Sequence, residues 1–488
     1  MLPILRAYFS IKKIWKHIPT TILQQRLFIT STSATPAVLC HSNERLALMQ
    51  FKESFISDKH ACAPILSSYP KAAGWGSQGK DCCSWDGVEC DQMTGVVIGL
   101  DLSAGCLYGS INSSSSLFRL LHLQKLNLAF NDFNHSLIPS ALGNLSMLTL
   151  LELRKPDLKS LIQNLTNLGN LKLSYVDVAS PVPSVLGLGN FSTLTSLDFE
   201  GCGLQGMFPS AIFQLPKLES IWLIHNSDLT GYLPEFSFSN KLKALALRNT
   251  SFSGSVPPML GNLTKLDSLD LQNNYLTGFI PPELTNLTQL TRLNLLQNML
   301  KGSVPSSISR LKKLEFFDCD ENKLGGILEM DSFLELKNLQ YLFLSLNDFY
   351  LVSRNNSNAT SPQLVDTGLR YCHLREFPYF LRSQRRLEIL DLSSNNIEGQ
   401  IPQWMSKVSV ETLLFLDLSN NSLTGFDEFP VVLPWSKLRY LKLDSNILQG
   451  SLPVPPLSTF FYTISNNSLS GEIPQLLCNA NSLSILDI

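Results

Sequence analysis

The sequence of 488 residues predicts an α/β repeat solenoid with a disulfide-linked cap at its N-terminal end. Two observations lead to this prediction. Leucines recur at a regular spacing through most of the chain, and six of the ten cysteines lie between residues 40 and 106. A chain of this length exceeds one ordinary hydrophobic core, so several domains or a repeat array are expected. The recurring leucines favour the array.

The repeat follows the pattern L-x-x-L-x-L-x-x-N, as in Leu266-Leu269-Leu271-Asn274. Successive copies lie 20 to 26 residues apart, mostly about 24, which is the spacing of leucine-rich repeats. Residues 96–488 therefore contain about sixteen repeats, followed by a partial one over residues 483–488. The Asn position of the repeats falls at residues 105, 131, 156, 176, 202, 226, 250, 274, 298, 322, 347, 372, 395, 421, 446 and 467.

Each part of the repeat has a mechanical role. Leu269 and Leu271 point inward from a short strand, while the alternate side chains point outward onto a concave face. A Gly followed by an apolar-Pro pair, such as Gly278 and Ile280-Pro281, fits a turn because Gly tolerates positive φ and Pro lacks an N–H. The following x-x-L-x-x-L suits a short convex helix or 3₁₀ turn. The predicted fold is a superhelix of leucine-rich repeats with a parallel concave sheet and convex 3₁₀ or short helices.

The Asn that ends each strand carries both a donor and an acceptor, so its buried amide can satisfy the backbone of neighbouring coils. Ten of the sixteen positions keep Asn. Partial substitutes stand at Thr250, Cys202 and Cys372. The residues at three further positions cannot replace the amide, which predicts a looser ladder in the early repeats: Gly105, Pro156 and Val176.

The clustered cysteines predict disulfides and an oxidising compartment, because no His lies at zinc-ligand spacing among them. Six cysteines allow many pairings, so the connectivity stays open. The disulfide candidates are Cys40, Cys62, Cys82, Cys83, Cys90 and Cys106. Four further cysteines are far apart, and we expect them to be buried thiols: Cys202, Cys319, Cys372 and Cys478.

Twelve N-x-S/T sequons are consistent with the same compartment, although some belong to the repeat's own Asn-Leu-Ser/Thr pattern. A polar loop is predicted at residues 350–361, and a glycosylated surface excursion is favoured there over a ligand loop. The glycosylation candidates are Asn112, Asn134, Asn144, Asn164, Asn190, Asn249, Asn262, Asn286, Asn355, Asn358, Asn420 and Asn466.

The N-terminal residues 1–39 form a targeting or leader segment of uncertain type. They contain five basic residues, no acidic residue and no apolar core of secretory length, a composition closer to that of an organelle transit peptide. The cysteines and sequons carry more weight and favour an extracellular location. The sequence contains no uninterrupted apolar run of about 18 residues, so we expect no membrane-spanning segment in this chain.

Residues 40–95 contain the most specific motif. A helix over residues 44–55 would place Ala47, Leu48, Phe51 and Phe55 on one face, which would seal the first coil. The run Cys82-Cys83-Ser84-Trp85-Asp86-Gly87-Val88-Glu89-Cys90 follows. With the Gly-x-Ile-Pro repeats, this segment resembles the N-terminal cap and plant-type extracellular leucine-rich repeats of plant receptor-like proteins, the disease-resistance class that lacks a kinase. The resemblance covers residues 40–488.

This resemblance implies a cell-surface receptor on the outer face of the plasma membrane, in defence or development. It would bind a protein, peptide or glycan ligand and signal through a partner co-receptor kinase. Family members continue with more repeats, a membrane helix and a short tail, so the resemblance implies a chain truncated after about sixteen repeats. Two alternatives stay open: a secreted inhibitor of a cell-wall hydrolase, resembling polygalacturonase inhibitors, and a truncated soluble decoy.

Ligand candidates are outward residues of the strands, because binding energy concentrates in aromatic and Arg side chains. Exposed apolar columns of Trp222 with Ile224, or of Phe316 with Tyr341 and Phe343, are the favoured sites. Alanine at Trp222 and Phe343 should weaken ligand binding by more than about 1 kcal/mol. The candidate ligand-binding residues are Trp222, Ile224, His225, Arg248, Arg292, Phe316, Asp318, Asp320, Tyr341 and Phe343.

No motif for catalysis is found, so we expect a protein that is not an enzyme and uses no cofactor or metal. Gly74 to Lys80 imitates a phosphate-binding loop, but Asp81 replaces the required Ser or Thr. The carboxylates of Asp318, Asp320 and Glu321 are interpreted as a solvated acidic patch rather than an acid-base pair. The net charge of −2 makes a nucleic-acid partner unexpected.

Overall fold

The computed structural model describes residues 39–57, 68–77, 80–128, 131, 139–152, 168–172, 192–352, 361–428, 430 and 432–488. The chain divides into two compact units, Met1–Leu39 and Cys40–Ile488, and the second unit contains the cap and the repeats. Several predictions lie outside the described residues: the leader segment up to residue 38, most of the polar loop, the ladder positions 156 and 176, Cys62, and five sequons at Asn134, Asn164, Asn190, Asn355 and Asn358.

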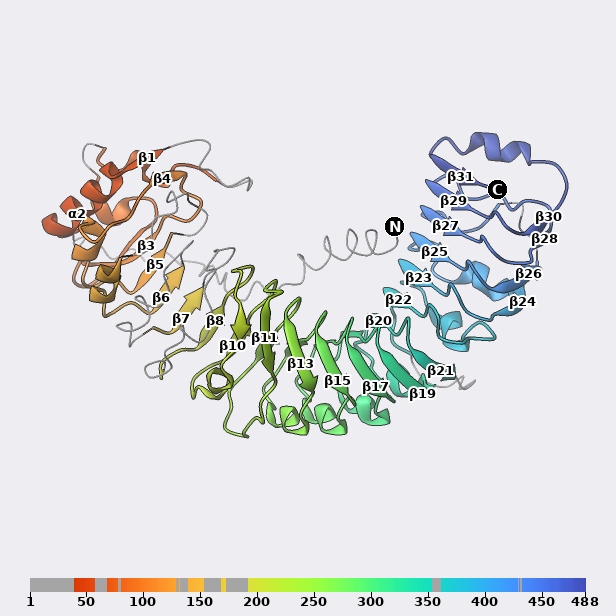
Figure 1. Ribbon diagram of the computed structural model, residues 1–488. Coiled ribbons are helices and arrows are strands. Elements are labelled where there is room, and N and C mark those ends of the chain that lie inside the picture. The colour runs from red at the N-terminus through yellow and green to blue at the C-terminus, as the bar shows by residue number, and fades with distance from the viewer. Residues whose placement is uncertain are drawn as a thin grey trace. The chain divides into compact units, whose positions relative to one another are not determined.

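A parallel main sheet runs through the second unit and confirms the predicted α/β solenoid (Figure 1). Each strand pairs in register with the strand of the next repeat, as Leu245 pairs with Leu269 and Leu269 with Leu293. The leucines at these central positions are fully buried, so stacking of coils forms one continuous core. Within the described residues the strands of the main sheet are β3 (Val97–Asp101), β5 (Lys125–Asn127), β6 (Leu150–Glu152), β7 (Asn170–Lys172), β8 (Ser196–Asp198), β10 (Ser220–Trp222), β12 (Ala244–Ala246), β14 (Ser268–Asp270), β16 (Arg292–Asn294), β18 (Phe316–Asp318), β20 (Tyr341–Phe343), β22 (Asp366–Gly368), β23 (Ile389–Asp391), β25 (Phe415–Asp417), β27 (Tyr440–Lys442), β29 (Phe461–Thr463) and β31 (Ile485–Asp487).

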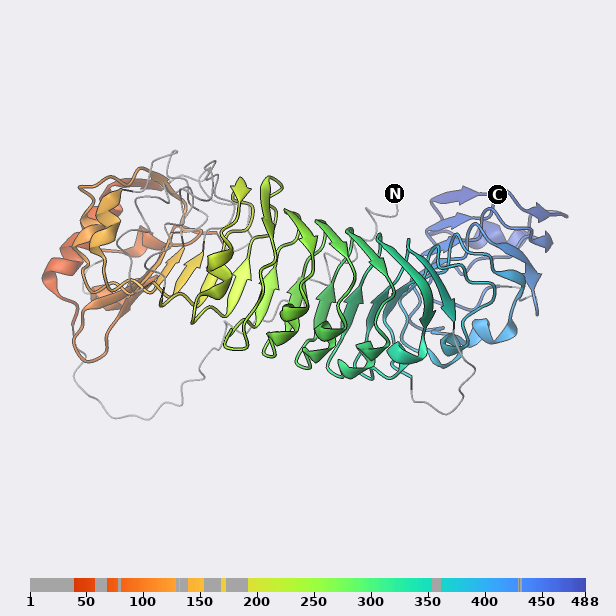
Figure 2. The ribbon, with the colours of Figure 1, turned by 60° about the horizontal axis from the view of Figure 1, so that its bottom comes forward.

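A second parallel sheet follows the ladder position in the coils between residues 206 and 352, with two shorter strand pairs farther along the chain, where the sequence predicted only a turn. Gly278 adopts φ +78° at the end of its strand, as the positive-φ argument requires. Figure 2 shows the coils of this region stacked side by side. The strands are β9 (Gly206–Met207), β11 (Leu229–Tyr232), β13 (Ser251–Ser255), β15 (Tyr275–Gly278), β17 (Met299–Gly302), β19 (Lys323–Glu329) and β21 (Asp348–Val352), with shorter pairs of β24 (Glu398–Ile401) and β26 (Ser422–Phe426), and of β28 (Gln449–Gly450) and β30 (Ser468–Leu469).

Short 3₁₀ helices cover the convex side, as predicted. Each of η7 (Pro258–Asn262), η8 (Pro282–Asn286) and η9 (Ser306–Arg310) follows a Pro at its N-cap, and their buried Leu or Ile side chains contribute to the core. One short α-helix, α5 (Asp331–Leu334), takes the same place in its repeat. The other 3₁₀ helices of the repeats are η4 (Ser116–Arg119), η5 (Ser140–Asn144), η6 (Ser210–Gln214), η10 (Tyr379–Ser383), η11 (Gln403–Lys407) and η12 (Gln475–Asn479).

The Asn ladder forms as the sequence predicts. Asn274 donates to the carbonyl of Leu247 in the preceding coil at 2.8 Å, and its Oδ1 accepts the N–H of Phe252 at 2.9 Å. Substitutes make part of the contacts of an Asn: Thr250 donates to the carbonyl of Leu247 in its own coil at 2.8 Å, as Asn274 does to Leu271 at 3.2 Å, and the Cys372 thiol lies 3.5 Å from the carbonyl of Leu344 in the preceding coil. The same pair of contacts to the preceding coil recurs at Asn131, Asn226, Asn298, Asn322, Asn347, Asn395, Asn421, Asn446 and Asn467.

The N-terminal cap begins with helix α2 (Ser42–Glu53), which buries Ala47, Leu48 and Phe51 as predicted. The helix ends two residues earlier than expected. Phe55 instead starts β1 (Phe55–Ser57), which pairs with the antiparallel strand β4 (Leu107–Gly109). Its ring still contacts Phe51 at 4.9 Å between centroids. The cap also contains η2 (Lys71–Gly74), η3 (Cys82–Ser84) and β2 (Val88–Cys90), and β2 pairs with β3.

Two disulfides join Cys40 to Cys82 and Cys83 to Cys90. Cys106 is also disulfide-bonded. Three of the remaining cysteines are buried thiols as expected: Cys202, Cys319 and Cys372. The prediction is wrong for Cys478, which is exposed because its place in η12 faces away from the core.

Among the described residues, no helix has the length and apolar character needed to cross a membrane.

Candidate ligand-binding face

The outward side chains of the main sheet form the surface that we call the concave face. Its strands are mostly three residues long and pair in register, so equivalent side chains align in rows across neighbouring repeats. The first residues of consecutive strands make one row, and the third residues make a second row. These rows bring the predicted ligand residues together.

An aromatic cluster lies on β18 and β20. The ring of Phe316 is 5.9 Å from that of Tyr341 and 5.8 Å from that of Phe343, centroid to centroid. The guanidinium of Arg292 on β16 stacks 3.7 Å from the centre of the Phe316 ring. The predicted column of Phe316, Tyr341 and Phe343 therefore exists as a packed group with a cation on it.

The predicted exposure of this column is wrong for two of its three rings. Phe316 and Phe343 are only 9 % and 7 % exposed, whereas Tyr341 is partly buried. Neighbouring strands lie about 4.8 Å apart, so large rings in adjacent repeats cover one another. An outward position on this sheet is therefore not necessarily an exposed position.

Trp222 is partly buried on β10 and lies in register between Asp198 and the small Ala246. The predicted partner of its column, Ile224, is 8 % exposed and thus mostly buried, which corrects the expectation of an exposed pair. The chain has already left strand β10 at this position. Trp222 is left as the accessible aromatic group of this column.

His225 and Arg248 form a polar pair beside Trp222. Arg248 Nη2 lies 3.2 Å from His225 Nε2, and Asn249 Nδ2 lies 2.8 Å from His225 Nδ1. A guanidinium only donates hydrogen bonds, so Nε2 accepts in this contact, and the neutral imidazole then carries its proton on Nδ1, which lies beside the Asn249 amide. Partial burial, followed by the charge of Arg248, lowers the pKa of His225.

The carboxylates of Asp318 and Asp320 are buried, which corrects their interpretation as a solvated acidic patch. Asp318 is 7 % exposed, and its Oδ1 accepts the N–H of Asp320 at 3.0 Å. Asp320 is 1 % exposed and accepts the N–H of Ser345. Asp318 thus satisfies a backbone donor of its own coil, and Asp320 satisfies one of the next coil. Glu321 remains at the surface, where Gln297 Nε2 donates to it at 2.8 Å.

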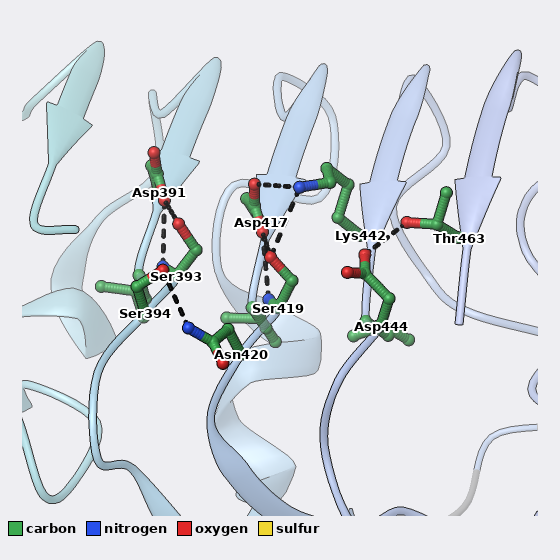
Figure 3. Close-up of polar contacts among 12 residues, drawn as sticks. Asp391, Ser393, Ser394, Asp417, Ser419, Asn420, Lys442, Asp444 and Thr463 are labelled. Atoms are coloured by element: carbon green, nitrogen blue, oxygen red, sulfur yellow. Dashed lines mark hydrogen bonds and ion pairs between the residues drawn. The ribbon is translucent and has the colours of Figure 1, made fainter. Parts of the chain in front are cut away.

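A second polar cluster, which is not among the predicted ligand residues, lies on β23, β25 and β27 (Figure 3). Asp391 accepts the N–H and O–H of Ser393, and Asp417 accepts the equivalent groups of Ser419. Lys442 Nζ lies 3.0 Å from Asp417 Oδ2. The signal in the sequence is the repeated Asp-Leu-Ser, but the alignment with Lys442 appears only once the register is known.

The described sequons lie in three settings and remain glycosylation candidates. Asn112, Asn144 and Asn286 are exposed on the side away from the main sheet or in its connections. The Asn262 amide donates to the carbonyl of Phe236 at 2.8 Å. The remaining three follow main-sheet strands with positive φ: Asn249, Asn420 and Asn466.

Two family models match this chain. The leucine rich repeat N-terminal domain matches residues 41–91, and the Leucine Rich Repeat matches residues 122–145, 265–287 and 386–408. Receptor-like protein 6 of Arabidopsis thaliana is 35% identical over 92% of this chain and 59% of that protein. Receptor-like protein Cf-9 of Solanum pimpinellifolium is 33% identical over 46% of this chain and 30% of that protein. The chain spans less than two thirds of the length of these relatives.

The chain is also similar to solved structures of receptors. The Arabidopsis receptor kinase HAESA, solved in complex with the peptide hormone IDA and the co-receptor SERK1, is 27% identical with a TM-score of 0.64. The match covers 92% of this chain and 86% of that chain. A TDR receptor is 26% identical with a TM-score of 0.56, over 82% of this chain and 65% of that chain.

Proposed function

This chain is a leucine-rich-repeat protein related to the plant receptor-like proteins. We therefore propose that it is an extracellular ectodomain that recognises a ligand. It binds a peptide or a protein segment on its concave face. It acts in defence or developmental signalling at the outer face of the plasma membrane, through a partner co-receptor kinase. The HAESA complex, with its bound peptide hormone and co-receptor, supports this combination of ligand and partner.

The observation that carries the proposal is the mixture of large rings and cations between β10 and β20. Trp222 and Tyr341 are partly buried and accessible, and Arg248 and Arg292 lie between them on the same face. Aromatic and Arg side chains supply most of the binding energy at protein interfaces. Arg292 is already held against the Phe316 ring at 3.7 Å, so little side-chain freedom is lost when a ligand binds it.

The spacing of these anchors fits an extended peptide. Trp222 on β10 and Tyr341 on β20 are separated by four intervening strands of the main sheet. At about 4.8 Å per strand spacing, the two rings are about 24 Å apart along the face. An extended chain covers that distance with about seven residues. A short peptide therefore reaches both anchors and the two arginines.

Panning of a random library of displayed twelve-residue peptides on the purified chain tests this function. We expect retained peptides to bind the wild type, and to lose about fivefold or more in affinity for Trp222→Ala and for Tyr341→Ala. Met259→Ala is the matched control, because Met259 is an exposed apolar residue of η7 on the convex side. The retained peptides should bind Met259→Ala with the same affinity as the wild type.

Two results would contradict this function. One is the failure of the wild type to retain peptides above the level of a heat-unfolded sample. The other is a set of retained peptides whose affinity falls for Met259→Ala but not for Trp222→Ala or Tyr341→Ala, which would locate recognition away from the concave face.

A further inference from the structure

Two carboxylates lie next to each other on the concave face, beyond the aromatic cluster. Asp391 on β23 pairs in register with Asp417 on β25. Asp391 is 2 % exposed and Asp417 is 0 % exposed. Burying two neighbouring carboxylates is unfavourable unless cations or hydrogen-bond donors compensate for them.

The donors around this pair leave one oxygen unsatisfied. Asp391 Oδ1 accepts the N–H of Ser393 at 2.9 Å and its O–H at 2.6 Å. Asp391 Oδ2 accepts no hydrogen bond from any described residue, and it points away from Ser393 (Figure 3). A side chain that is almost wholly buried thus presents an unpaired anionic oxygen.

Only one carboxylate of the pair has a cation in direct contact among the described residues. Lys442 Nζ lies 3.0 Å from Asp417 Oδ2. Arg370, which follows β22, adds a second positive charge to this region, but its buried Nε has no hydrogen-bond partner. No described cation makes an ion pair with Asp391. Burial, then the charge of Asp391, raise the pKa of Asp417 to about 6, against the opposing effect of Lys442.

Aromatic rings flank the carboxylates in the adjacent row. Phe415 and Tyr440 are the first residues of β25 and β27, and their ring centroids lie 6.1 Å apart. Tyr440 is partly buried and so reaches the surface. A carboxylate beside aromatic rings is a favourable setting for an organic cation, which gains both an ion pair and a cation–π contact.

We propose that the Asp391–Asp417 pair binds a positively charged side chain, Lys or Arg, of the peptide ligand. The cation donates a hydrogen bond to Asp391 Oδ2 and is the ion-pair partner that Asp391 lacks among the described residues. This inference rests on the proposed function, because it assumes a peptide on the concave face. β23 is two strand spacings beyond β20, or about 10 Å, so about three further residues of the peptide reach Asp391 from Tyr341.

The test uses the same library of random twelve-residue peptides, and it measures the frequency of Lys and Arg among retained peptides against the input library. The wild type should enrich these residues. Asp391→Asn should remove the enrichment, because the amide keeps an acceptor for both Ser393 donors but carries no charge. Asp444→Asn is the matched control: it removes one charge from the same face, at a carboxylate that already accepts the Thr463 O–H at 2.6 Å.

A double-mutant cycle then assigns the contact. One retained peptide is synthesised with its basic residue and with Gln in its place, and both are measured against the wild type and Asp391→Asn. We expect the change to Gln to cost about tenfold in affinity for the wild type and almost nothing for the variant. Thermal unfolding of Asp391→Asn checks that the variant is folded.

Retained peptides without Lys or Arg enrichment, or with equal enrichment on Asp391→Asn, would overturn the cation site and leave the concave-face function intact. The same loss of enrichment in Asp444→Asn would also overturn it, because any negative charge on the face would then suffice. A wild type that retains no peptide would contradict the proposed function and this inference together.

Discussion

At the scale of the residue, the concave face separates side chains that hold the coils together from those available to a ligand. Asp320 and Phe343 point outward from the sheet, yet they are 1 % and 7 % exposed. Asp320 binds a backbone N–H of the next repeat, and Phe343 packs against Phe316. Of the aromatic residues predicted to bind a ligand, Trp222 and Tyr341 are the accessible ones. Asp391 is about as buried as Asp320, but its Oδ2 accepts no hydrogen bond from a described residue and is therefore free to bind a ligand. Position on a strand therefore has to be combined with the size of neighbouring side chains before a residue is assigned to recognition.

Alanine substitutions of Phe343 and Tyr341 are expected to lower the free energy of unfolding by different amounts. Phe343→Ala removes a largely buried ring from the aromatic cluster, and we expect it to lower the free energy of unfolding by about 2–4 kcal/mol. Tyr341→Ala should cost less than about 1.5 kcal/mol, because its ring is only partly buried. Urea unfolding followed by circular dichroism measures both. Equal losses for the two variants would show that the difference in burial has no energetic consequence.

Asp417 predicts a pH dependence of stability with a defined sign. Its pKa is raised from 3.8 to about 6 in the folded protein, so the folded state binds this proton more tightly than the unfolded state. The group therefore favours folding at low pH, and this stabilisation is lost as the pH rises from about 4 to about 6. Asp417→Asn, which cannot titrate, should lack this component.

The measurement is the apparent melting temperature of the wild type minus that of Asp417→Asn between about pH 4 and pH 7. The difference should fall as the pH rises. Asp444→Asn serves as the control, and its difference from the wild type should not show that fall. A difference for Asp417→Asn that stays constant, or rises with pH, would contradict the assigned burial of this carboxylate.

At the scale of the element, the main sheet and the side-chain amides of the Asn ladder join the coils, and a second parallel sheet joins those between residues 206 and 352. Asn274 links three backbone or side-chain groups of the neighbouring coil: the Leu247 carbonyl, the Phe252 N–H and the Thr250 hydroxyl. The main sheet and the convex helices were predictable, because leucine spacing and Pro position specify them. The second sheet was not, because its segments of two to seven residues show no alternation that separates a strand from a turn.

Asn274→Ala should be strongly destabilising. The change leaves the Phe252 N–H buried without its side-chain partner and removes one of two donors to the Leu247 carbonyl, which Thr250 still reaches at 2.8 Å, at a cost of about 2 kcal/mol. Hydrogen exchange of the Phe252 amide should accelerate in the variant. The adjacent Asn273 offers a matched control, since its amide makes an exposed contact to Asn249 at 3.0 Å. If Asn273→Ala accelerates Phe252 exchange as much as Asn274→Ala, the ladder does not account for this protection.

At the scale of the whole molecule, the cap and the repeats place a long row of outward residues on one sheet. The cap residues Trp75 and Trp85 stack at 5.4 Å and cover the start of the core, and the register then carries through to β31. The sequence was sufficient for this architecture and for the choice of face. The sequence was not sufficient to predict which residues of that face are accessible. The burial of Phe316 and the pairing of Asp391 with Asp417 depend on cross-strand neighbours about 24 to 26 residues away in the chain.

The central claim is that a peptide is recognised on the concave face rather than on the second sheet, which also exposes aromatic residues. Hydroxyl-radical footprinting of the wild-type chain, with and without a peptide retained from the library, tests this claim directly. We predict that the bound peptide protects Trp222 and Tyr341 from oxidation and leaves Tyr232 and Tyr275 of the second sheet unchanged. Protection of Tyr232 and Tyr275, with Trp222 and Tyr341 oxidised as in the free chain, would contradict it.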